Sequence, residues 1–193
     1  MLTSQSNSTI QKSSPSFWKL VAKYEKPRLL KSVWQLVNTL VPYVVLWYLM
    51  YLSLRVSYAL TLALAVLAAG FLVRTFIIFH DCVHGSFFKS LKAVRFWGFL
   101  TGLLVFTPYA PWRNEHNRHH MSSGNLDARG SGCGWTMTVK EYLSAGRWKR
   151  LAYRFLRNPL CLFTVIPAFL FLVLHRFPSR KESREVRRGT HLT

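Results

Sequence analysis

The chain has 193 residues, the length of one ordinary domain, and its 26 Lys and Arg outnumber its 7 Asp and Glu. In a soluble protein a formal net charge of +19 would indicate nucleic acid as the partner. Here the basic residues flank long apolar runs and no nucleic-acid-binding motif is present, so we expect contact with anionic lipid head groups instead.

Residues 1–32 are expected to form a basic N-terminal segment. Its first part is polar, rich in Ser and Thr, and lacks the apolar centre of a secretory signal peptide, so a disordered tail is expected. Between residues 17 and 32, basic side chains are interspersed with aromatic ones. That pattern fits a segment lying on a membrane surface, and it fits a solvated charged linker nearly as well.

Two uncharged apolar runs follow, at residues 33–54 and 56–73, with Arg55 between them. A helix needs about 20 apolar residues to cross the hydrocarbon core of a membrane. The alternative, a buried helical pair in a soluble protein, is disfavoured by two uncharged runs of this length. We therefore predict a transmembrane hairpin.

The second run is expected to continue as a helix past Arg74 and to carry a first histidine cluster, His80-Asp81-Cys82-Val83-His84. Residues four apart lie on one face of a helix, so the two imidazoles are predicted to be neighbours. Ionisable groups are costly in hydrocarbon, which favours a position just outside the membrane. We expect Gly85 to end the helix.

A third apolar run, residues 93–107, is too short to cross, since a helix of this length covers only about 22 Å. We expect an interfacial or re-entrant element that returns the chain to the same side. Pro108 and Pro111 interrupt it, and a second cluster, His116-Asn117-Arg118-His119-His120, is predicted to follow on a new helix. Spacings of three and four from His116 put all three imidazoles on one face.

These two clusters hold five of the seven histidines. A single histidine is usually an ordinary core or surface residue, but this spacing beside membrane-like segments indicates a metal site. Five nitrogens exceed the ligands of one tetrahedral zinc, so two ions sharing them is the better interpretation. Iron, zinc and copper all suit such a set. The predicted metal ligands are His80, His84, His116, His119 and His120.

Residues 121–158 are polar and include a basic amphipathic stretch, which predicts a cytosolic cap over the site. Asn125, Asp127 and Arg129 are expected to anchor this cap by hydrogen bonds. The last apolar run, residues 160–174, is short and interrupted by Pro167. If it crossed, the basic residues after it would lie on the wrong side, so we expect it to be embedded without spanning.

Both clusters resemble histidine boxes of the membrane fatty acid desaturases. The first box matches His80-Asp81-Cys82-Val83-His84-Gly85-Ser86-Phe87-Phe88, and the second matches Trp112-Arg113 with His116-Asn117-Arg118-His119-His120. Residues 124–142 and Arg157-Asn158-Pro159 resemble segments that follow the second box. The resemblance covers roughly residues 34–193 and is greatest to the omega-6 (delta-12) type that acts on acyl lipids.

The resemblance implies an oxidoreductase whose di-iron centre uses O2 and two electrons to introduce a cis double bond into the fatty acyl chain of a membrane lipid. The five clustered histidines would be the iron ligands, with Asp81, Glu115 and Asn117 as candidates for orienting them. Ferredoxin or cytochrome b5 would donate the electrons. The basic face of residues 140–157 suits an acidic carrier, and it suits a lipid surface equally well.

The main departure from the family is that no third histidine box follows His120, and a smaller one is Cys133-Gly134, where relatives usually have an aspartate followed by an apolar residue. The remaining histidines, His175 and His191, are isolated, and residues 187–193 resemble the lead-in to a further helix pair. The resemblance therefore implies a chain that stops about halfway, and we expect it to be inactive alone. A related di-iron hydroxylase or ketolase, or a truncated non-catalytic membrane protein, stays open as an alternative.

The sequence as a whole predicts an all-α integral membrane protein. We expect one transmembrane hairpin, interfacial or re-entrant helices and a cytosolic histidine-rich cap, and the resemblance implies truncation before a second helix pair. The expected organisation is a basic N-terminus at residues 1–32, an incomplete membrane domain at 33–178 and a basic tail at 179–193. Both histidine clusters and both termini are expected on the cytoplasmic side.

Overall fold

The computed structural model describes residues 19, 22, 26–129 and 135–173. Within these residues every regular element is helical and no strand occurs, in agreement with the predicted all-α class. Most of the predicted N-terminal segment and all of the predicted tail at 179–193 lie outside the described residues. The elements in chain order are α2 (Leu29–Ser53), α3 (Tyr58–Val83), α4 (Leu91–Leu104), α5 (Tyr109–Ser122), η1 (Leu126–Ala128), α6 (Val139–Ser144), α7 (Arg147–Leu156), η2 (Cys161–Val165) and α8 (Ile166–Leu172).

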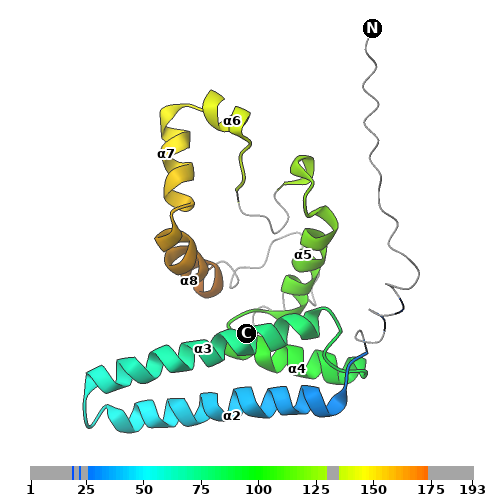
Figure 1. Cartoon of the computed structure of the whole chain (residues 1–193), viewed down its shortest axis with the longest axis vertical. Helices are drawn as coiled ribbons and strands as arrows, with labels where there is room; N and C mark the ends of the chain where they lie inside the picture. Colours follow the sequence, from blue (N-terminus) through cyan, green and yellow to red (C-terminus); the bar gives the residue numbers. More distant parts are fainter. Residues whose placement is uncertain (1–18, 20–21, 23–25, 130–134, 174–193) are drawn as a thin grey trace.

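Helices α2 and α3 form a long antiparallel pair joined by a short turn (Figure 1). Near the turn the hydroxyls of Ser53 and Thr61 lie 2.7 Å apart, and farther along Arg74 donates to the Asn38 side chain at 2.9 Å. Both helices are long and apolar enough to cross a membrane, and only 22% of the most apolar window of each is buried. Such exposure is unlike that of core helices in a soluble protein.

Helix α3 runs without interruption through Arg74 and ends one residue before His84, as predicted. Its end has the Schellman arrangement, in which Gly85 N donates to Cys82 O at 3.0 Å and Ser86 N to Asp81 O at 3.1 Å. Gly85 has a φ of 72°, a left-handed conformation that glycine adopts without a steric penalty. The prediction that Gly85 ends this helix is confirmed.

Helix α4 is short, and it packs against the last turns of α3 through two glycines. A methyl group on Gly98 would lie 3.2 Å from Cβ of Cys82 in α3 and 2.4 Å from Cε2 of Tyr109, and one on Gly102 would lie 3.1 Å from Cε2 of Phe79 in α3. These contacts place the start of α5 beside the end of α3. The chain therefore returns to the end of the helix pair from which α4 began. The short element and the new helix after Pro108 are as predicted, whereas the position of α4 in a membrane stays a prediction.

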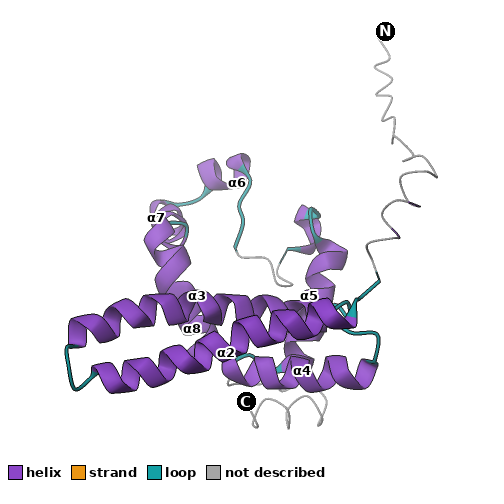
Figure 2. Ribbon diagram, turned by 60° about the horizontal axis from the view of Figure 1, so that its bottom comes forward, coloured by secondary structure: helices purple, strands orange, loops and turns teal. Residues whose placement is uncertain are grey.

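The second half of the described chain forms an arm made of α6, α7, η2 and α8. Figures 1 and 2 both show α6 and α7 standing apart from α5, and neither helix buries a residue. The arm is held by hydrogen bonds instead, above all by Arg129, which pairs with both carboxylate oxygens of Glu141 at 2.8 Å. The predicted anchoring by Arg129 is confirmed, and the predicted cap over the site stays a prediction.

Candidate metal centre

Four histidines from two helices meet at the end of the α2–α3 pair. His80 lies in the last turn of α3 and His84 caps it, while His116 and His120 lie four residues apart on α5. One ligand atom from each of the four falls within a group no wider than 4.8 Å. The contacts join Nε2 atoms, at 3.3 Å for His80–His84, 3.1 Å for His84–His116, and 3.0 Å for both His80–His116 and His116–His120.

Tyr109, the first residue of α5, fixes this helix against α3. Its hydroxyl donates to Cys82 O at 3.1 Å, and its ring lies edge-on to Phe79 with centroids 6.2 Å apart. Cys82 lies between the two histidines of α3, so the bond ties α5 to the turn that carries them. Because Gly98 has no side chain, the ring of Tyr109 can occupy this position.

Trp112 supports the imidazole at the centre of the cluster. Its ring stacks on that of His116, with centroids 4.2 Å apart and planes inclined by only 15°. The other contacts of Trp112 are with α3, through Phe79 at 5.1 Å and the edge of His80 at 5.9 Å. The stack therefore limits the rotation of His116 and keeps its Nε2 directed at the histidines of α3.

The chemistry of these donors indicates a metal ion. Each neutral Nε2 carries either a hydrogen or a lone pair, so among the mutually touching His80, His84 and His116 at least two nitrogens are of the same kind and cannot hydrogen-bond. A cation resolves this conflict because every nitrogen then offers its lone pair to one centre. Two nitrogens bound to one ion at about 2.0–2.1 Å lie about 3.0–3.4 Å apart at angles of about 90–110°. The four contacting pairs fall in that range, whereas the group as a whole spans up to 4.8 Å.

Electrostatics favours the metal-binding form of two of these side chains. Burial, together with repulsion from His80 and His120, lowers the pKa of His84, against an opposing effect of Asp81. Burial is also the largest cause at His116, whose pKa falls to about 4 with added repulsion from the surrounding histidines. Both imidazoles are therefore neutral at pH 7 and hold a lone pair for a metal.

The remaining predicted site residues lie outside this group of four. His119 is on α5, like His116 and His120, and its ring centroid lies 6.2 Å from that of His116 and 5.8 Å from that of His120. Asp81 places Oδ1 3.6 Å from Nδ1 of His80, which suits its predicted orienting role. Glu115 and Asn117 are exposed on α5, and their predicted role stays a prediction.

Tyr109, Gly98 and Trp112 position the site in the structure, and none of them was predicted to do so from the sequence. A signal for the glycine was present, because Gly98 and Gly102 are four residues apart in a short apolar helix, the spacing that lets helices approach closely. The roles of the two aromatic residues depend on contacts with α3, a distant segment, and no local pattern reveals them.

The chain is similar in sequence to a known protein family over most of its length. A family model described as fatty acid desaturase matches residues 53–193, which include both histidine clusters and the arm. The chain belongs to the fatty acid desaturase family. No solved structure gives a significant match to it.

Curated fatty acid desaturases with similar sequences come from bacteria, plants and a nematode. The fatty acid desaturase of Bacillus subtilis (strain 168) is 49% identical over 185 residues, which are 96% of this chain and 53% of that protein. The sn-1 acyl-lipid omega-3 desaturase (ferredoxin) of Synechocystis sp. (strain ATCC 27184 / PCC 6803 / Kazusa) is 33% identical over 108 residues, 56% of this chain and 27% of that protein. The chloroplastic omega-6 fatty acid desaturase of Spinacia oleracea is 30% identical over 115 residues, 60% of this chain and 25% of that protein.

The chain thus spans about half the length of the Bacillus relative and less of the other two. The relatives include both omega-3 and omega-6 desaturases. Sequence similarity therefore does not assign this chain to either of these two groups.

Proposed function

We propose that this chain supplies the first two histidine clusters of a membrane acyl-lipid desaturase, which introduces a cis double bond into a fatty acyl chain. The observation that carries the proposal is the meeting of four imidazoles, whose contacting Nε2 atoms are 3.0–3.3 Å apart, in a chain of the desaturase family. When bound, a di-iron centre would supply the oxidation with O2 and two electrons, because an unactivated methylene C–H bond is beyond any protein side chain.

Within the proposed centre the histidines have distinct duties. His80, His84, His116 and His120 would hold one iron ion, since their nitrogens already form one compact group. His119 would serve the second ion, because it lies on the same helix but outside that group of four. Asp81 would keep the ring of His80 oriented through Nδ1, which leaves Nε2 for the metal.

The proposed setting is a membrane with the histidines at its cytoplasmic rim. Helices α2 and α3 would cross as a hairpin, with their turn on the far side. The N-terminus of α2 and the end of α3 lie at the same end of the pair, and the basic residues are concentrated in the segments beyond that end. The excess of Lys and Arg beyond this end supports a cytoplasmic location for it.

Two features favour an acyl lipid as substrate and an acidic protein as electron donor. Relatives named for acyl-lipid substrates and for ferredoxin match this chain. Helix α7 presents basic side chains on an exposed helix, among them Arg147, Lys149 and Arg150. Opposite charge raises the rate of encounter with an acidic carrier such as ferredoxin or cytochrome b5.

Catalysis would require ligands beyond this chain's two clusters. The family's third histidine box has no counterpart among the residues after His120, where only His175 and His191 remain. With five histidines the chain can hold one ion well and the second incompletely, so we propose that it does not desaturate a lipid alone.

A metal titration tests the proposal directly. The detergent-purified chain is titrated with Fe²⁺ under anaerobic conditions and its bound metal is measured by elemental analysis. One tightly bound ion per chain is expected, and His84→Ala should lose it, whereas His175→Ala, which changes an isolated histidine, should retain it. Equal binding by both variants, or no binding by the unchanged chain, would contradict the proposal.

A further inference from the structure

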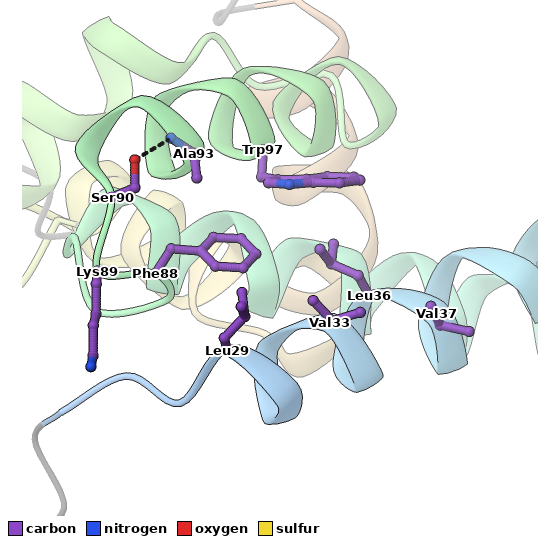
Figure 3. A pocket seen from close by; sticks show the side chains of 9 residues that line it. All are labelled: Leu29, Val33, Leu36, Val37, Phe88, Lys89, Ser90, Ala93 and Trp97. Atoms are coloured by element: carbon purple, nitrogen blue, oxygen red, sulfur yellow. Dashed lines mark hydrogen bonds between the residues drawn. The ribbon is translucent and has the colours of Figure 1, made fainter.

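An apolar groove lies between α2 and α4, beside the histidine site but separate from it. Its volume is about 500 Å³, within the usual range for sites that hold small molecules. The side chains that line it are almost all apolar, and Figure 3 shows those of α2 facing Phe88, Ala93 and Trp97 across the opening. The full lining is Leu29, Val33, Leu36, Val37, Phe88, Lys89, Ser90, Ala93 and Trp97.

The walls of the groove are firmly held. Ser32, a buried residue of α2, donates its hydroxyl hydrogen to Phe87 O at 2.5 Å, which ties the start of α2 to the loop before α4. Leu36 and Phe88 form part of the core with Ile78 of α3. The groove is thus a feature of the packed part of the fold, and an occupant would meet a surface that is already formed.

Charge at one end of the groove favours an anion. Lys89 lines that end, and Figure 3 shows its amine pointing away from the apolar side chains. Arg28, Lys31 and Lys92 are exposed on the adjoining ends of α2 and α4. Between positions 26 and 114 the sequence has one acidic residue, Asp81, and its carboxylate lies 3.6 Å from Nδ1 of His80, so basic residues outnumber acidic ones at that end.

An apolar slot with a cationic end matches the chemistry of a phospholipid. From Leu29 to Val37 the α2 wall extends about 12 Å, which approaches the depth of one leaflet of a hydrocarbon core about 30 Å thick. The cationic end lies where α2 begins and α3 ends, at the head-group level in the membrane placement proposed above. A phosphate at Lys89 and a hydrocarbon chain along α2 would therefore match both parts of the groove.

We propose that this groove binds one anionic phospholipid, with its phosphate at Lys89 and one acyl chain between α2 and α4. None of the five clustered histidines lines the groove, so the lipid is a bound neighbour of the site and not its substrate. The inference rests on the proposed membrane placement, but it needs no metal and no catalysis. Its failure would leave the metal titration unaffected.

The test measures lipid binding by the full chain. The protein is delipidated in detergent, mixed with equal amounts of phosphatidylglycerol and phosphatidylcholine carrying identical acyl chains, and examined by native mass spectrometry. We expect one phosphatidylglycerol to remain bound per chain, with at least about a fivefold preference over phosphatidylcholine, since one lysine near an anionic group contributes about that much.

Two variants separate the contributions of charge and shape. Lys89→Gln should abolish the preference while leaving the groove open, and Lys149→Gln, which removes an equally exposed charge from α7, should not. Val33→Phe should reduce binding of both lipids by filling the groove, whereas Val66→Phe, at a position 73% exposed on α3, should not.

Several results would overturn the proposal. One is equal retention of the two lipids by the unchanged chain. Another is loss of the preference in Lys149→Gln to the same degree as in Lys89→Gln, which would mean that net charge alone attracts the lipid. A third is unchanged binding in Val33→Phe, since the acyl chain would then lie elsewhere. Displacement of the lipid by a peptide segment of a longer desaturase would likewise show the groove to be a protein contact.

Discussion

The described chain contains two regions that are held together by different means. In α2 to α5, buried apolar side chains and glycine contacts bring helices together, and the buried apolar residues of the fold lie there with the exception of Cys161. In α6 and α7, no residue is buried, and exposed ion pairs and hydrogen bonds set the geometry. The histidines belong to the packed region, where positions are fixed to the precision that metal ligands require.

The largest loss of metal affinity should follow the removal of His116, whose Nε2 contacts histidines at the end of α3 and on α5. His116 touches His80, His84 and His120, so His116→Ala is expected to weaken binding of the first ion by about a hundredfold or more, beyond the effect of residues that only orient ligands. His119→Ala is the matched control on the same helix and should leave that ion bound. Competition against a coloured chelator measures both, and equal losses would contradict the assignment of four ligands.

The aromatic support of His116 is expected to matter next. Trp112→Ala removes the stacked ring, and metal affinity should fall by about tenfold to a hundredfold while the ligands themselves remain. Trp148→Ala removes a tryptophan that is 72% exposed on α7 and serves as the control from the other region. If both variants bind metal with the affinity of the unchanged chain, the stack does not position the site.

Substitution of a closely packed glycine should lower the stability of the folded chain, whereas substitution of an unpacked one should not. Gly98→Ala puts a methyl group 2.4 Å from the Tyr109 ring, and the forced shift should destabilise the chain by about 1–3 kcal/mol. Gly70→Ala, in α3, meets nothing within 4 Å and should be neutral or stabilising by up to about 1 kcal/mol. Thermal unfolding in detergent, followed by circular dichroism, compares the two, and a similar melting temperature for both would count against the close packing of α4 on Tyr109.

The smallest effect is expected at the ion pair of the arm. Bonds from Arg129 and Thr138 lower the pKa of Glu141 from 4.5 to about 2. A lowered folded-state pKa means that the stabilisation is complete above pH 4.5 and is lost as the pH falls toward 2. Glu141→Gln should therefore lower the protection of α6 amides from hydrogen exchange at pH 7. In that variant the protection, corrected for the intrinsic exchange rate at each pH, should no longer fall between pH 4.5 and 2.

The control for that substitution is Lys140→Gln, an exposed neighbour on α6. Metal binding should not change in either variant, because the arm and the histidines are held independently. Loss of metal from Glu141→Gln would show that the two regions are coupled.

Much of the packed region was predictable because its signals are local. The uncharged apolar runs predicted the helix pair, and the spacing of His80 and His84 predicted that they share a face. Gly85 predicted the end of α3. The membrane crossing and its orientation stay predictions.

The rest depends on contacts between distant segments. Helical spacing predicts that His116, His119 and His120 share a face, but which of them meets α3 depends on how Tyr109 docks α5. The groove likewise arises from two helices that are far apart in sequence, and Arg129 pairs with Glu141, twelve positions farther along the chain. The spacing of residues within a single helix does not reveal these contacts between distant segments.

The most direct test of the four-histidine centre is X-ray absorption at the zinc edge, on the detergent-purified chain loaded with one Zn²⁺, a redox-silent probe. Four imidazoles should appear, with nitrogens at about 2.0–2.1 Å and the outer-shell scattering typical of histidine. His119→Ala should give the same spectrum, and His116→Ala should not. A centre with two or fewer imidazoles, completed by water or carboxylate oxygens, would contradict the convergence of His80, His84, His116 and His120 on one ion.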